Sequence, residues 1–129
     1  LSAPAPFRVV DTTSAADAEL DFTAPFELAA TAEGTLRCFV VHFDTAFAPA
    51  GGVATSFTTA ASATSTHWKQ TVFYLKDAIT ICKGEKITGT LECRPNEKNE
   101  RDLDVVIEYK FEGSMDTCTT EARMEYRMR

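Results

Sequence analysis

Residues 102–112 read DLDVVIEYKFE, and this stretch decides the fold class of the chain. Its apolar side chains fall on alternate positions, and charged side chains occupy most of the positions between them. Because successive side chains of a β-strand point to opposite faces of a sheet, the pattern predicts a strand with one buried and one solvated face. The alternating apolar residues are Leu103, Val105, Ile107, Tyr109 and Phe111.

A second alternating stretch, KITGTLEC at 86–93, precedes the first one. The two are joined by 94–101, RPNEKNER, whose Pro-Asn start and high charge are typical of a hairpin connection. Gly84 marks a turn before the second stretch. We therefore predict two adjacent antiparallel strands.

Further strand-like runs occur at 7–10, 26–30, 36–43, 53–58 and 71–75. The run at 36–43 is apolar on both faces, which predicts a strand covered on each side. No amphipathic helix longer than two turns is evident. Six or more short strands with turn residues between them predict an all-β fold, an antiparallel β-barrel or a barrel-like sandwich of short strands.

Composition excludes several classes of protein. The 129 residues allow one domain, 1–129, and 19 acidic against 13 basic residues give a net charge of −6. Nucleic-acid binding depends on clustered basic residues, so we expect no direct nucleic-acid partner. No stretch approaches the roughly 20 apolar residues of a membrane helix, and no leader pattern opens the chain, so we expect neither membrane association nor a signal peptide.

The four cysteines are expected to be free, mostly buried thiols of a reducing compartment, because none forms a metal-binding or C-x-x-C pattern. They are Cys38, Cys82, Cys93 and Cys118. A secreted barrel with two disulfides is a weaker alternative.

The candidate functional residues are Thr66, His67 and Trp68. They follow an uncharged, Ala/Thr/Ser/Gly-rich connection at 48–65 that we expect to be mobile in part, and they include the only Trp and one of two histidines. A purely structural interpretation is that Trp68 fills one end of the barrel and His67 makes a surface hydrogen bond. His42 lies within an apolar run and is expected to be structural. Neither histidine has metal-ligand spacing, and no Ser lies in a nucleophile elbow.

Three motifs in one order carry a family resemblance. They are THWKQTVFY at 66–74, RPN at 94–96 with KN at 98–99 and RDLD at 101–104, and YRMR at 126–129. Together they resemble the C-terminal β-barrel of type I protein arginine N-methyltransferases. The similarity is dense from 66 to 129 and looser over 20–47.

The resemblance implies an enzyme that transfers methyl from S-adenosyl-L-methionine to the guanidinium of peptidyl-arginine, giving asymmetric dimethylarginine. The loop of Thr66, His67 and Trp68 would be the barrel's supporting contribution to the active site. In the family, the histidine pairs with an acidic residue of the cofactor domain, and the tryptophan shapes the arginine pocket. Trp68 could also offer its ring face to the substrate cation.

The glycine-rich turn and the paired glutamates of the family's cofactor domain are not found in this sequence. We therefore expect that the chain lacks the S-adenosylmethionine-binding domain, binds no cofactor and is inactive alone. Its expected partners are that domain and Arg/Gly-rich proteins or histones, in the nucleus, the cytoplasm or both. No helical arm is evident, so the usual family dimer is not expected.

A stand-alone acidic β-barrel module that binds basic Arg/Gly-rich peptides is the alternative function. The acidic residues of 102–112 would then form a track for arginines. An ordinary solvated strand face explains the same residues and is the favoured interpretation.

Overall fold

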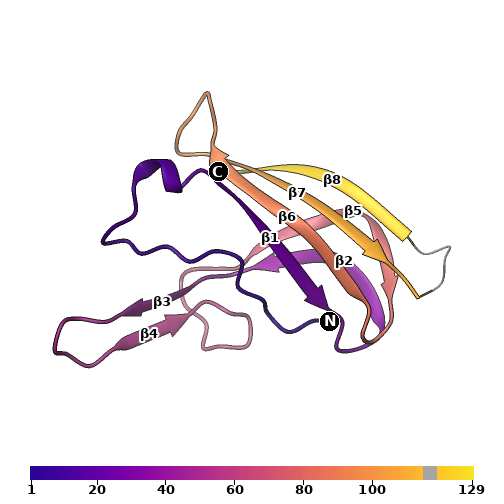
Figure 1. Ribbon diagram of the computed structural model, residues 1–129, viewed down its shortest axis with the longest axis horizontal. Coiled ribbons are helices and arrows are strands. Elements are labelled where there is room, and N and C mark those ends of the chain that lie inside the picture. Colours follow the sequence, from indigo (N-terminus) through magenta and orange to yellow (C-terminus); the bar gives the residue numbers. More distant parts are fainter. Residues whose placement is uncertain (115–118) are drawn as a thin grey trace. The chain divides into compact units, whose positions relative to one another are not determined.

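A computed structural model describes residues 1–114 and 119–129. These residues form a short 3₁₀ helix and eight β-strands, which confirms the all-β class (Figure 1). The elements are η1 (Asp17–Glu19), β1 (Phe22–Ala29), β2 (Gly34–Val41), β3 (Asp44–Phe47), β4 (Thr55–Thr58), β5 (Thr71–Ile81), β6 (Lys86–Pro95), β7 (Leu103–Glu112) and β8 (Thr119–Met128).

Hydrogen bonding divides these strands into three sheets. The largest has the order β1-β6-β7-β8 with every neighbouring pair antiparallel, while β2 pairs with β5 and β3 pairs with β4. Among the described residues the backbone ladders do not close into one continuous barrel. The antiparallel part of the prediction is confirmed, and the sheets are separate rather than continuous.

The chain divides into two compact units. One consists of 1–36 and 76–129 and holds the four-stranded sheet; the other consists of 37–75 and holds the β3–β4 hairpin. Strands β2 and β5 each run from one unit into the other.

The register of the four-stranded sheet brings the alternating apolar residues onto one face. Leu91 of β6 pairs with Ala24 of β1 and with Ile107 of β7, and Ile107 in turn pairs with Met124 of β8. Phe111 and Ile107 are its most deeply buried large side chains. The strand predicted from 102–112 is therefore confirmed together with the face that it buries.

Gly89 interrupts the apolar face of β6 for a steric reason. A Cβ atom at this position would clash with the carbonyl oxygen of Glu108 and would lie 2.7 Å from Cζ of Phe26. Gly84, in the turn before β6, has a φ of +91°, which favours glycine. The predicted turn at Gly84 is confirmed.

The predicted hairpin between β6 and β7 is organised by Asn96, whose side chain is only 5% exposed. Its Oδ1 accepts hydrogen bonds from the backbone N–H groups of Lys98 (3.0 Å) and Asn99 (3.2 Å). Its Nδ2 donates to Oδ2 of Asp104 at 2.8 Å, and its backbone N–H donates to the carbonyl of Asp102 at 2.9 Å. The buried Asn96 side chain therefore organises the start of the connection, and the Asn99 side chain bonds Asp102 and the N–H of Arg101 in the rest of it.

Other boundaries differ from the sequence prediction. Residues 7–10 form no strand, so that prediction was wrong; Phe7 and Arg8 instead place side chains against the ring of Phe22, at 6.4 and 5.2 Å from its centroid. The strand expected over 36–43 spans 34–41; its middle residues Cys38 and Phe39 are at least half-buried, but Val40 is half exposed.

The predicted strand at 53–58 begins at 55. Strand β8 alternates exposed and half-buried residues, a signal that the sequence analysis missed.

Candidate functional site

The connection between β4 and β5, residues 59–70, is tied at both ends to the same point. Thr59 is 3% exposed, and its hydroxyl accepts from the N–H of Phe43 (3.1 Å) and donates to the carbonyl of Phe43 (3.0 Å). At the other end, Nε2 of Gln70 donates to the carbonyl of Thr59 at 2.6 Å. The connection is therefore a closed loop, which we call the 59–70 loop.

Inside the 59–70 loop, Thr66 shapes the backbone around the two aromatic residues that follow it. Its hydroxyl donates to the carbonyl of Trp68 at 3.0 Å, and its own carbonyl accepts from Nζ of Lys69 at 3.2 Å. These contacts lie within four residues of chain and give Thr66 a local structural task.

Trp68 belongs to an aromatic cluster with two residues of the β3–β4 region. Its indole is nearly parallel to the ring of Phe57 (5.3 Å between centroids, 15° between planes) and meets Phe43 edge-on (6.0 Å, 74°). Phe57 and Phe43 also meet edge-on, at 6.1 Å and 77°. Stacked and edge-to-face arrangements are the favourable geometries for aromatic pairs. Trp68 is nevertheless 46% exposed.

His67 lies on this cluster and is exposed. The centroid of its imidazole is 3.9 Å from that of the Trp68 indole, with 35° between the planes. Within the described ranges, 1–114 and 119–129, no carboxylate lies within ion-pair distance of His67. His42 differs, because it is half-buried and its Nε2 lies 3.9 Å from Oδ1 of Asp44.

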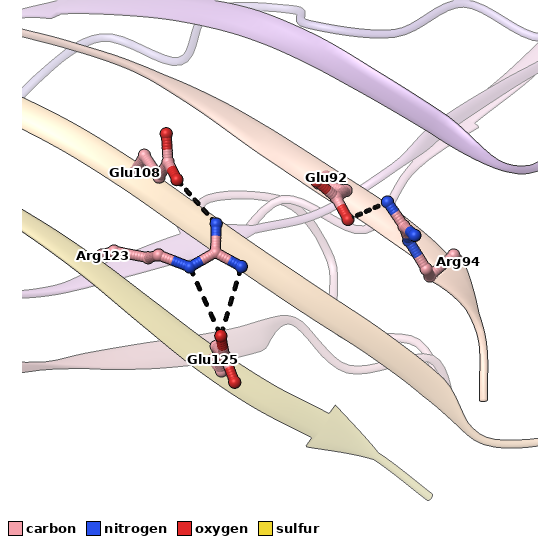
Figure 2. Close-up of polar contacts among 5 residues, drawn as sticks. All are labelled: Glu92, Arg94, Glu108, Arg123 and Glu125. Atoms are coloured by element: carbon pink, nitrogen blue, oxygen red, sulfur yellow. Dashed lines mark hydrogen bonds and ion pairs between the residues drawn. The ribbon is translucent and has the colours of Figure 1, made fainter. Parts of the chain in front are cut away.

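The second candidate surface is the polar face of the four-stranded sheet, where an acidic track was considered. Figure 2 shows Arg123 reaching between two carboxylates, with Nη1 2.6 Å from Oε1 of Glu108 and Nη2 3.2 Å from Oε1 of Glu125. Glu92 forms an ion pair with Arg94 on the same face. Each of the three carboxylates in this view is therefore paired with an arginine, and Arg123 is shared between Glu108 and Glu125.

The remaining acidic side chains of β7 are compensated in the same way. Oδ1 of Asp104 lies 3.3 Å from Nε of Arg127, and Oε1 of Glu112 lies 2.5 Å from Nζ of Lys110. These pairs are largely exposed, as expected for a solvated strand face. The interpretation as a solvated face is confirmed, and β7 does not present a row of free carboxylates.

The described cysteines differ in exposure. Cys38, Cys82 and Cys93 are free thiols; Cys38 and Cys93 are half-buried, whereas Cys82 is exposed, contrary to the expectation for it. Burial raises the pKa of the Cys93 thiol, and the charge of Asp21 raises it further. Cys118 lies outside the described residues. In the described part of the chain, no group of His, Cys, Asp and Glu is arranged to hold a metal ion.

No helix among the described residues is long and apolar enough to cross a bilayer.

Some residues of the site escaped sequence reasoning. Phe43 and Thr59 carry no motif of their own, Gln70 lies within the 66–74 motif but was given no role, and Phe57 stood out only as a large side chain in an uncharged segment. Their partners lie 11 to 16 residues away and follow no period. The sequence offered one signal for this region. The segment before Thr66, residues 48–65, carries no charge, unlike the charged strand faces elsewhere in the chain.

Comparison with known proteins gives one consistent result. A family model described as the arginine methyltransferase oligomerization subdomain matches residues 1–114. Protein arginine N-methyltransferase 1 of Chlamydomonas reinhardtii is 44% identical over 120 residues, covering 93% of this chain and 34% of that protein. The same enzyme of Caenorhabditis elegans is 43% identical over 110 residues, covering 85% and 31%. The chain thus spans about a third of the length of these curated relatives.

Solved structures agree. A chain of the Trypanosoma brucei protein arginine methyltransferase 1 enzyme–prozyme heterotetrameric complex with AdoHcy matches with a TM-score of 0.91 and 34% identity, over 99% of this chain and 40% of that one. Arabidopsis thaliana protein arginine methyltransferase 10 matches with a TM-score of 0.89 at 18% identity, over 99% and 39%, and this likeness concerns the fold alone.

Proposed function

The chain belongs to the protein arginine methyltransferase family, as the C-terminal oligomerization and β-barrel subdomain of a type I member, and we propose that it is the substrate-side part of such an enzyme. The complete enzyme would transfer methyl from S-adenosylmethionine to a guanidinium nitrogen of peptidyl-arginine, with asymmetric dimethylarginine as product. The observation that carries the proposal is the family match over residues 1–114, within which the exposed pair His67 and Trp68 lies on an internally tied loop.

The described residues do not fit S-adenosylmethionine itself. A nucleotide cofactor of this kind is held where a strand turns into a helix, and the only helix among the described residues is the three-residue η1. Gly89 lies inside a strand and Gly84 in a turn between strands, so neither glycine opens a helix. We propose that the cofactor is bound by another domain of the enzyme, which is also the first partner of this chain.

His67 is proposed to act by alignment across the boundary between this chain and that domain. Its imidazole is exposed and free of carboxylate contacts among the described residues, so it can meet an acidic side chain supplied from outside. Methyl transfer gains most from the alignment of donor and acceptor, which a fixed contact between domains provides. Trp68 would form a wall of the arginine pocket. Thr66 would hold the loop backbone through its hydrogen bond to the carbonyl of Trp68.

A reconstitution assay tests this proposal. Labelled S-adenosylmethionine and an Arg/Gly-rich peptide are supplied to this chain alone and to its mixture with a separately expressed cofactor domain. We expect methylation only in the mixture, and its loss with His67→Ala. His42→Gln is the matched control, because the other histidine of the same unit is already paired with Asp44. Methylation that survives His67→Ala would contradict the proposed role of the loop.

The substrates, location and assembly of the enzyme belong to the same proposal. We propose Arg/Gly-rich proteins and histones as substrates, in the nucleus or the cytoplasm. The trypanosomal relative was solved as a heterotetramer, and the matching family model is described as an oligomerization subdomain. That this chain alone does not form the usual family dimer stays a prediction, which light scattering at several concentrations measures.

The alternative of a stand-alone peptide-binding module receives little support from the sheet. Its acidic track would need free carboxylates, and those of β7 are already paired with Arg123, Arg127 and Lys110. Peptide binding by the chain alone, without methylation in the mixture, is the outcome of the same assay that would favour this alternative.

A further inference from the structure

The aromatic cluster of unit 37–75 is more than a support for Trp68. We propose that Phe57 is a positioning residue for the His67 imidazole and that it acts through Trp68. The order of contact is a stack, from Phe57 on β4 to the Trp68 indole to the imidazole. The relevance of this stack to methyl transfer rests on the proposed function, whereas the stack itself can be tested without any enzyme activity.

Phe57, Trp68 and His67 are linked by close ring contacts. The planes of Phe57 and Trp68 differ by only 15° at a centroid distance of 5.3 Å, so a large area of the indole rests on the Phe57 ring. The imidazole lies closer still, with its centroid 3.9 Å from that of the indole. Any tilt of the indole must therefore also move the imidazole.

The imidazole of His67 has no other restraint among the described residues. Among the hydrogen bonds and ion pairs of the described residues, none involves the side chain of His67. The side chain of Thr66 and that of Lys69 bond to the loop backbone, and neither reaches the imidazole. Ring contact with Trp68 is thus the interaction that orients His67 within the chain.

Phe57 is anchored in the β3–β4 hairpin. Phe57 pairs with Thr45 in the β3–β4 ladder, and the ladder is extended by Thr59, which exchanges three hydrogen bonds with Phe43. Phe43 in turn meets both Phe57 and Trp68 edge-on. The stack therefore starts from a hydrogen-bonded hairpin rather than from another flexible side chain.

This arrangement also changes how Trp68 is understood. Its indole contacts three aromatic side chains within the chain, although Trp68 remains 46% exposed. We infer that its main effect on the reaction is to orient His67, and that a direct contact with the substrate cation is secondary.

Proton NMR of the whole 129-residue chain is the direct test, because the sequence has only two histidines and one tryptophan. An indole in ring contact displaces the imidazole resonances of His67 by its ring current, and His42→Gln assigns the remaining set to His67. We expect Phe57→Leu, which keeps an apolar side chain but removes the ring, to move the His67 resonances toward those of a free histidine. Phe57→Tyr keeps the ring and should leave them in place.

Phe47→Ala is the matched control, since Phe47 is an exposed aromatic residue of the same hairpin with no ring contact among those described. The His42 resonances report whether each variant is folded. Unmoved His67 resonances in a folded Phe57→Leu chain would overturn the inference. If Phe57→Leu does not fold, Phe57→Met serves as the second variant with the same expectation.

Kinetics in the reconstituted mixture separate this inference from the proposed function. We expect Phe57→Leu to lower kcat about 10- to 100-fold with little change in the KM of the peptide, because misalignment affects the reacting geometry more than binding. Phe57→Tyr should restore kcat. An inactive parent mixture with the NMR result intact would reject the proposed function and leave the stack standing. Normal kcat in Phe57→Leu, with displaced His67 resonances, would reject the positioning role.

Discussion

Loop 96–102, which joins β6 to β7, and loop 59–70, which joins β4 to β5, both contain residues that the sequence singled out. In loop 96–102 the prominent residue, Asn96, is buried, and its side chain makes three hydrogen bonds to its own hairpin. In loop 59–70 the prominent residues, His67 and Trp68, are exposed, and the contacts that the described residues give their side chains are with other rings. A sequence motif in a loop can therefore specify either the conformation of the loop or the side chains that the loop exposes. The burial of the prominent side chain distinguishes the two cases.

Asn96→Ala should give the largest change in stability and no change in the aromatic cluster. It leaves Oδ2 of Asp104 and two backbone N–H groups without their partner in a part-buried turn, which costs about 2–3 kcal/mol of unfolding free energy. Urea unfolding measures this loss. Trp68 fluorescence of the folded variant should match that of the parent.

Lys98→Ala is the control for Asn96, because only the backbone of Lys98 takes part in the turn. An equally large loss of stability in Lys98→Ala would mean that the loop is not organised by the Asn96 side chain.

Thr59→Val should have a smaller effect on stability but should reach the aromatic cluster. It removes a buried hydroxyl that bonds both backbone groups of Phe43, at a cost of about 1–2 kcal/mol. Because two of the three hydrogen bonds between Thr59 and Phe43 are lost and only the backbone bond remains, Phe43 is held less firmly, and we expect a red shift of Trp68 emission and stronger quenching by acrylamide. Thr55→Val, at the exposed start of β4, is the comparison variant, because no side-chain hydrogen bond of Thr55 is among those of the described residues. Unchanged Trp68 emission in Thr59→Val would show that the loop does not depend on this tie.

The smallest expected effect on stability comes from Glu85. It anchors its turn with a charged side chain, whereas Asn96 anchors its loop with a neutral one. Its carboxylate accepts hydrogen bonds from the backbone N–H groups of Cys82 and Ser114, both at 2.6 Å, and these bonds lower its pKa from the ordinary 4.5. A group with a lowered folded-state pKa stabilises the fold above its unfolded pKa, and this contribution is lost as the pH falls through the folded value.

Stability should therefore decrease below about pH 4.5 in part through Glu85, and Glu85→Gln should flatten that part of the profile. Denaturant midpoints measured between pH 7 and pH 3 check this, with Glu97→Gln as the control for an exposed glutamate. An identical pH profile in Glu85→Gln and the parent would show that Glu85 does not contribute to the pH dependence of stability. Asn96 has no charge to titrate, so its loop should not share the effect.

Much of the fold could be predicted because its signal is local. Alternation at 102–112 predicted β7 and the face that it buries, and Gly84 predicted the turn before β6. The run at 7–10 misled because apolar residues also cover a sheet without pairing in it, as Phe7 does against Phe22. Strand β8 was missed although every second residue is half-buried, since Thr, Ala and Tyr make that alternation weak.

The residues of the candidate site fall into two groups, those that the sequence indicated and those that only the structure showed. Thr66, His67 and Trp68 were identified from their place after an uncharged segment, from the only Trp standing beside a His, and from the family resemblance. Phe57, Thr59 and Gln70 could not be found, because their importance lies in contacts with residues distant along the chain.

The sequence by itself determined the all-β class, the strand that forms the core and the family to which the chain belongs, because alternation and motifs are properties of neighbouring residues. Only the tertiary structure decided that the carboxylates of β7 are paired with bases from β7 and β8 and that Phe57 lies under Trp68. The physical reason is that register and loop closure bring together residues whose separation along the chain carries no information about their contact.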